Sequence, residues 1–292
     1  MANTFGTSTT SKALRDKYRL AQLDQALRNA VVAEKVCMVD RSALKTISNP
    51  YITAVSTTIQ AVAGTYSPAA LTTTDEQLEV TDEAIASTHI FDFEAVTANF
   101  DLFYEANRAI TNSLVQAIDK WVVNELCEGG TGTYTTPAGG FTTAANFVII
   151  LSNIQAKCAG YADALNGLYV IVESGDLVGI LQSQAANGFN FADSALRNGL
   201  IGNMLGVDIF VVRAGLFVDA ATTAASGSKT WTNSGHRVGG VKMVTTYAAP
   251  RGLRFEEKGV TGKTGMEVAG IGYIGFKVWT PRAALTIDIT LA

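Results

Sequence analysis

The sequence predicts an α+β fold, and three observations lead to that class. Residues 99–128 carry apolar side chains at three- and four-residue steps, which is the spacing of one long helix. Two stretches before that helix, residues 51–63 and 77–96, have strand composition or strand alternation. From residue 241 onward the pattern is β throughout. This order of helical and β-like segments indicates an α+β arrangement of a single chain.

The N-terminal part of the chain predicts an amphipathic helix over residues 12–35. Its apolar positions are near helical spacing: Leu14, Tyr18, Ala21 and Leu27. Basic residues stand among them, and three are candidate interface residues: Arg15, Arg19 and Arg28. Amphipathicity does not distinguish a helix packed on its own core from an arm that reaches a partner, so both interpretations stay open.

Residues 51–96 predict two long strands joined by a polar tip, which together make a protruding hairpin. The second strand alternates, with His89 and Phe91 on one face and Asp92 on the other. Acidic residues gather near the expected tip: Asp75, Glu76, Glu79, Asp82 and Glu83. Solvation is the ordinary explanation for such a group, and docking on a neighbour's basic residues is the alternative. We take Asp75, Glu76 and Glu79 as interface candidates.

The long helix is the most strongly patterned element. Asn99 can cap its start, and Gly129 with Gly130 ends it. Its length is about 40 Å at 1.5 Å per residue. The apolar stripe that we expect to be buried comprises Phe103, Ile110, Leu114, Ala117, Trp121 and Val122.

The remaining chain predicts a mixed core. Helices are expected at residues 142–160 and 176–186, and strands at 168–172 and 207–212. Residues 220–240 are rich in Gly, Ser and Thr and are interpreted as a polar insertion. Strands are then expected at 241–244, 252–256, 265–269, 273–280 and 284–290.

Composition excludes several classes of protein. Hydrophobic residues make up 48% of the 292 residues and charged residues only 16%, which is too few charges for a disordered chain. A formal net charge of -4 argues against a basic nucleic-acid binder. Three cysteines without a Cys-x-x-Cys pair give neither a disulfide framework nor a zinc knuckle. The low charge suggests that copies of the chain cover much of its surface.

No motif in the sequence carries catalytic, cofactor or metal chemistry, so we expect no enzyme. Residues 270–275 read GIGYIG and match a dinucleotide fingerprint, but a strand follows where that site needs a helix N-terminus. Close strand packing explains these glycines instead. The GKT at residues 262–264 has Glu257 where a phosphate loop needs glycine. The two histidines, His89 and His236, have no partner at metal-ligand spacing.

The order of elements resembles the major capsid protein of tailed bacteriophages, the Hong Kong ninety-seven-like fold that encapsulins share. Four segments carry the resemblance: LVQAID at 114–119, LYVIVES at 168–174, LRNGLIG with GVDIFV at 196–211, and GYIGFKV at 272–278. They are degenerate, so their order and spacing give the specificity, over roughly residues 12–289. The proline that usually follows the 168–174 strand is missing. No Lys, Asn and Glu set for subunit cross-linking can be matched.

The resemblance implies a division of the chain into five parts. These are an N-terminal arm (1–48), an extended β-hairpin loop (49–97), a spine helix with peripheral domain (98–140), an axial domain (141–248) and closing peripheral strands (249–292). It implies a capsid protein that assembles through hexamers and pentamers into an icosahedral shell around double-stranded DNA. Expected partners are other copies, scaffolding and portal proteins, with no membrane and no cofactor. The expected location is the virion capsid, after assembly in the bacterial cytoplasm.

Three other functions stay open at this point. An encapsulin-like compartment would share the fold but enclose a cargo enzyme. A phage tail or adhesion protein would share the Thr- and Gly-rich composition, although the long helix argues against it. A cytoplasmic enzyme with a dispersed active site is the last alternative.

Overall fold

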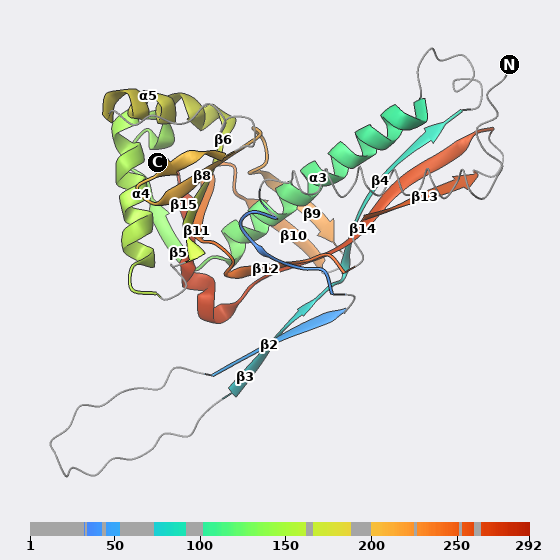
Figure 1. The fold of residues 1–292 in the computed structure, drawn as a ribbon, viewed down its shortest axis with the longest axis horizontal. Helices are drawn as coiled ribbons and strands as arrows, with labels where there is room; N and C mark the ends of the chain where they lie inside the picture. The colour runs from blue at the N-terminus through green and yellow to red at the C-terminus, as the bar shows by residue number, and fades with distance from the viewer. Residues whose placement is uncertain are drawn as a thin grey trace, which may run out of the picture.

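The computed structural model describes residues 32, 34–42, 45–52, 73–91, 102–161, 166–187, 200–224, 227–250, 253–259 and 264–292. Nearly all of the predicted arm helix, including Arg15, Arg19 and Arg28, lies outside these residues, as does the expected tip of the hairpin. Figure 1 shows two sheets joined by one long helix, with a two-stranded hairpin projecting from the body.

The long helix α3 runs from Leu102 to Gly129 and confirms the strongest prediction from the sequence. Its 28 residues span about 42 Å. The buried stripe follows four-residue steps through Ile110, Leu114, Ile118, Val122 and Leu126. Two stripe assignments were wrong, because Ala117 is exposed and Trp121 is only half-buried at the edge of the core. Trp121 meets Phe276 edge-on, with ring centroids 6.2 Å apart.

One face of α3 packs on a five-stranded sheet. Its strands are β1 (Met38–Asp40), β12 (Thr245–Ala248), β14 (Met266–Val278), β13 (Leu253–Gly259) and β4 (Asp82–Ile90). The 13-residue β14 organises the sheet because it pairs with β12 near its C-terminal end and with β13 and β4 along the rest. The sequence predicted two shorter strands here, divided at the glycines that β14 in fact carries through its middle.

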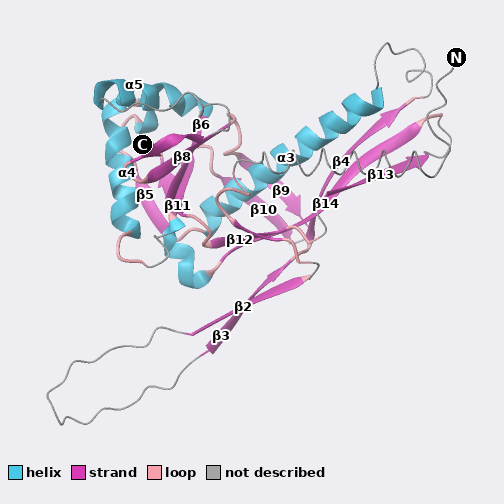
Figure 2. Cartoon of the chain, in the orientation of Figure 1, coloured by secondary structure: helices cyan, strands magenta, loops and turns pink. Residues whose placement is uncertain are grey.

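A second, six-stranded sheet has the order β5-β15-β11-β6-β8-β7. Its strands are β5 (Gly132–Thr135), β15 (Thr286–Thr290), β11 (His236–Val241), β6 (Leu168–Glu173), β8 (Val207–Val212) and β7 (Leu200–Met204). The helices α4 (Ala144–Cys158) and α5 (Leu177–Asn187) lie against this sheet, as Figure 2 shows. The predicted inward side of α4 is confirmed, since Phe147, Leu151, Ile154 and Cys158 are all buried. Short 3₁₀ turns complete the chain at η1 (Gly140–Thr142), η3 (Ser174–Asp176) and η5 (Thr280–Leu285).

The predicted polar insertion at residues 220–240 was wrong. β9 (Asp219–Ala224) and β10 (Gly227–Thr232) form a two-stranded sheet, and β11 is an inner strand of the six-stranded sheet. The glycines of β11 made this strand resemble a loop in the sequence. They are needed for packing, because an added Cβ at Gly239 would lie 2.9 Å from Cδ1 of Ile154. The expected strand at 241–244 is mostly a turn, and β15 joins the six-stranded sheet rather than the sheet beside β13 and β14.

The predicted hairpin exists, but it is shorter than expected. β2 (Thr46–Ile52) pairs with β3 (Thr73–Glu79) in a separate two-stranded sheet that projects from the body in Figure 1. Strand β3 ends at Glu79, and the N–H of the next residue, Val80, donates to the carbonyl oxygen of Lys45 at 2.8 Å. β4 follows and belongs to the sheet under α3. Residues 77–91 are therefore not one strand, and within them only the part before residue 80 leaves the body.

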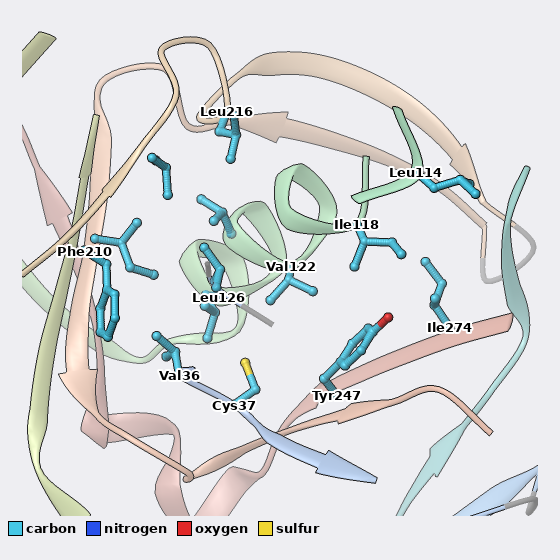
Figure 3. Close-up of a cluster of buried hydrophobic side chains, with 14 of the residues drawn as sticks. Val36, Cys37, Leu114, Ile118, Val122, Leu126, Phe210, Leu216, Tyr247 and Ile274 are labelled. Atoms are coloured by element: carbon cyan, nitrogen blue, oxygen red, sulfur yellow. The ribbon is translucent and has the colours of Figure 1, made fainter. Parts of the chain in front are cut away.

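The largest hydrophobic cluster takes side chains from both large sheets and lies around α3. Figure 3 shows Leu114, Ile118, Val122 and Leu126 of the helix between Phe210 of one sheet and Tyr247 of the other. The chain just after the predicted arm joins this cluster, since Val36 and Cys37 are fully buried there. The helix is therefore the shared core element that ties the two sheets into one body.

Candidate interaction surface: the hairpin and its root

The three acidic interface candidates all lie on β3, close to the body rather than at the tip of the hairpin. Glu79 forms an ion pair of 3.0 Å with Lys45, and both side chains are exposed. Asp75 is also exposed and accepts a hydrogen bond from Nε2 of Gln77 at 3.2 Å. Asp75 and Glu79 are therefore open to solvent on the hairpin, as a surface for a partner requires.

Glu76 is different because its carboxylate bonds the same subunit. Its Oε2 accepts the backbone N–H of Thr280 at 3.0 Å, and its Oε1 accepts the Thr280 hydroxyl at 3.1 Å. Nζ of Lys277 lies 3.1 Å from the same Oε1. Glu76 is thus already bonded within its own subunit, so reversing its charge would disturb the subunit itself.

These contacts change the acidity of Glu76. Partial burial raises its pKa, but the bonds from Thr280 and the ammonium group of Lys277 outweigh that effect and lower the pKa below its ordinary value. The side chain is therefore held as a carboxylate. Sequence reasoning missed both partners, because they lie about two hundred positions away and no local signal joins them to β3.

A small apolar cluster lies beside these polar contacts at the root of the hairpin. Leu78 and Val80 pack with Trp279 and Ala248, all of them buried, and Ile47 of β2 packs against the cluster. Nε1 of Trp279 donates to the Thr246 hydroxyl at 2.8 Å, which fixes the indole ring. Farther along the hairpin the side chains become exposed, and 55% of Ile52 is accessible. The hairpin is thus fixed at its root and uncovered beyond it.

The C-terminal end of the predicted arm helix is anchored by a second buried carboxylate. The N–H of Val32 donates to Oδ1 of Asp119 on α3 at 3.2 Å. Val32 is fully buried, and 7% of Asp119 is exposed. In the sequence, Asp119 ends the LVQAID segment beside the apolar stripe of the helix. An acidic residue within an apolar helical stripe was the available signal that it has a backbone partner.

The glycines of the GIGYIG motif are explained by packing, as the sequence analysis expected. All of residues 270–275 lie within strand β14. A Cβ added at Gly270 would come within 2.7 Å of both Cγ2 of Ile110 and Cδ1 of Leu114. Glycine at this position therefore lets α3 lie directly on the sheet, and no helix N-terminus follows to hold a pyrophosphate.

One His–Asp pair and three buried cysteines in the described residues serve the packing of the subunit. Nδ1 of His236 lies 2.8 Å from Oδ1 of Asp288, a pair that bridges β11 and β15. Burial raises the pKa of Cys37 to about 12 and of Cys158 to about 11, and it raises that of Cys127 well above its ordinary value. All three thiols are therefore protonated and poorly nucleophilic.

Neither a metal-binding cluster nor a membrane-spanning helix is found among the described residues. No group of three or more His, Cys, Asp or Glu side chains there could hold a metal ion. No helix in the described part of the chain has the length and apolar character to span a membrane.

Comparison with known proteins decides the family. The profile of the phage capsid protein family matches residues 64–287, which is more than half of the chain. The chain is a phage capsid protein. It is therefore a structural component of a virion shell rather than an enzyme, and it works by associating with further copies of itself. A comparison with curated protein sequences finds no match.

Solved structures share the fold of this capsid protein along most of its length. The capsid structure of the cyanophage P-SCSP1u has a TM-score of 0.67 at 14% identity, covering 90% of this chain and 88% of that one. Mycobacterium phage Che8 has a TM-score of 0.61 at 18% identity, covering 84% of each chain. A virus-like particle from Pyrococcus furiosus has a TM-score of 0.60 at 11% identity, covering 94% of this chain and 99% of that one. The α+β capsid fold predicted from the sequence is confirmed.

Proposed function

We propose that this capsid protein is the major shell subunit, which forms hexamers and pentamers and closes an icosahedral shell around double-stranded DNA. Support comes from the hairpin β2–β3, a two-stranded sheet that contacts its own body only near its root in the described residues. An isolated two-stranded sheet is marginally stable in water, so it needs a covering partner. In a closed ring of copies, each subunit can cover the hairpin of the next, and the same contact is repeated around the ring.

The composition supports the same proposal. A chain with 16% charged residues can build large lateral interfaces at low desolvation cost, because interface cores are depleted of charge. Its net charge of -4 disfavours tight phosphate binding, which suits a shell that must package and release DNA. In this proposal Asp75 and Glu79 face a neighbour's basic residues, and Arg15, Arg19 and Arg28 belong to an arm along the inner surface. Scaffolding and portal proteins are the other proposed partners.

Electron microscopy of the purified chain, expressed alone and with a scaffolding protein, tests this function. Closed shells with five-fold and six-fold capsomers are expected. Discrete small oligomers under every salt and scaffold condition would contradict it.

The contents of the shells distinguish the encapsulin-like alternative. Its basis is the shared fold of the Pyrococcus furiosus virus-like particle. Shells from infected or lysogenic cells are expected to yield DNA on extraction. Shells that contain one protein cargo and no DNA would favour the compartment instead.

A further inference from the structure

The bonds of Glu76 connect the projecting hairpin to the body just beyond the apolar root. Glu76 belongs to β3 of the projecting hairpin, whereas Lys277 is the last residue but one of β14 and Thr280 begins η5 of the body. The carboxylate accepts three bonds from these two residues, at 3.0 to 3.1 Å. The Glu76 side chain is 15% exposed and that of Lys277 is 30% exposed, so solvent screens the contact in part.

Lys277 strengthens the same connection through the backbone. Its Nζ also donates to the carbonyl oxygen of Gln77 at 3.0 Å, so it holds the strand as well as the carboxylate. The ammonium group lies 5.8 Å from the ring of Trp279, which is buried in the apolar root. The Lys277 ammonium group is therefore positioned by the body, through Trp279, as well as by its contacts with β3.

These contacts lie where they can limit rotation of the hairpin about its root. Leu78 is packed into the root, and Glu76 is the next inward-facing residue of β3 along the hairpin. Beyond it, Thr73, Thr74 and Asp75 are exposed. A strand rises about 3.3 Å per residue, so a small rotation at the root is amplified with every residue beyond Glu76.

We propose that Glu76, with Lys277 and Thr280, is a latch that fixes the direction in which the hairpin leaves the free subunit, and that assembly depends on it. The latch holds the hairpin in one direction before a neighbour is present. A subunit without the latch samples many hairpin directions, and fewer encounters then lead to docking. This inference rests on the proposed function, in which the hairpin covers a neighbouring subunit.

Glu76→Ala is the main variant, and Glu79→Ala is its matched control on the same strand. Glu79 also pairs with a lysine, Lys45, but that pair is exposed and joins the two chain segments of the hairpin to each other rather than to the body. Lys277→Met is a second variant that keeps the apolar stem over Trp279 and removes the ammonium group with its charge and hydrogen bonds. Amide hydrogen exchange of unassembled subunits is measured for residues 46–52, 73–79 and 280, together with the global urea midpoint.

The latch predicts at least a tenfold rise in exchange at the Thr280 amide and along the hairpin in Glu76→Ala. Lys277→Met should give a smaller rise, and Glu79→Ala should match the wild-type exchange. Glu79→Ala is a control for exchange only, because Glu79 faces a neighbouring copy in the proposed shell. The urea midpoint should change little in all three, and light scattering should show slower assembly of Glu76→Ala and Lys277→Met.

Two results would overturn the latch. Unchanged hairpin exchange in Glu76→Ala would show that the apolar root alone holds the hairpin. Raised exchange with a wild-type assembly rate would show that its direction in the free subunit does not matter. If the wild type forms no shells, the proposed function fails, and the assembly dependence fails with it. The exchange data then still decide whether Glu76 holds the hairpin.

Discussion

Gly179→Ala offers the sharpest test of the packing described for the six-stranded sheet, because two physical effects predict opposite signs. Gly179 lies within helix α5, where alanine has the higher helix propensity by about 1 kcal/mol. Propensity alone therefore predicts a more stable subunit. The structure predicts a less stable one, because α5 crosses the backbone of η1 at Gly179.

The magnitude follows from the distances. A Cβ at residue 179 would lie 2.1 Å from the carbonyl oxygen of Phe141 and 2.7 Å from the backbone of Thr142, whereas ordinary contact begins at 3.4 Å. Backbone atoms cannot rotate away, so the whole helix must shift against η1. Overpacking of this kind costs about 1–3 kcal/mol or more. After the gain in propensity of about 1 kcal/mol, we expect a net loss of up to about 2 kcal/mol in the free energy of unfolding.

Urea denaturation of unassembled subunits measures this loss, and the melting temperature should fall by about 4–8 °C. Gly175→Ala, in η3 just before the same helix, is the control, because nothing lies within 4 Å of its added Cβ. It should stay within about 0.5 kcal/mol of the wild type. A Gly179→Ala subunit as stable as the control, or more stable, would refute the close approach of α5 to η1.

Three further predictions test other parts of the structure. Gly270→Ala should lower the free energy of unfolding in urea by about 1–3 kcal/mol, because its Cβ would overlap the stiff, β-branched Ile110 on α3. Gly259→Ala is the control and should be neutral, since its Cβ meets nothing within 4 Å; equal urea midpoints for the two variants would contradict the packing. Asp119→Ala should cost about 1–3 kcal/mol by leaving a buried N–H unpaired, with Asp119→Asn milder; a neutral Asp119→Ala would show that the bond contributes nothing. Glu76 has a lowered pKa, so its hold on the hairpin should be complete above the ordinary value of about 4.3 and disappear as the pH falls through the lower folded value. The ratio of the Thr280 amide exchange rates in Glu76→Gln and wild type, followed from pH 7 to 3, should therefore fall toward one, and a constant ratio would contradict the carboxylate's role.

Local patterns predicted the helices well and the glycine-rich strands poorly. The stripe of α3 and the inward side of α4 were readable because a helix repeats its contacts within a few residues. Trp121 was misplaced because the stripe has an edge, and periodicity does not say where it lies. β11 was missed because its glycines, which allow close packing, also resemble a loop.

Long-range contacts explain what the sequence could not predict about the surface. The acidic residues of β3 looked alike in the sequence, yet only Glu76 meets Lys277 and Thr280. That difference depends on how the end of β14 returns past the hairpin, which no pattern near residue 76 encodes. The capsid fold itself was predictable because the order of its elements is a property of the whole chain.

The burial of all three cysteines has a practical consequence for following shell formation. Cys37, Cys127 and Cys158 lie in the interior with protonated thiols, so maleimide reagents should leave the folded subunit unlabelled. A cysteine introduced at an exposed position such as Ile52 would then be the reactive thiol. A fluorophore attached there would report directly on the moment when one subunit's hairpin meets the next, without first removing any native thiol.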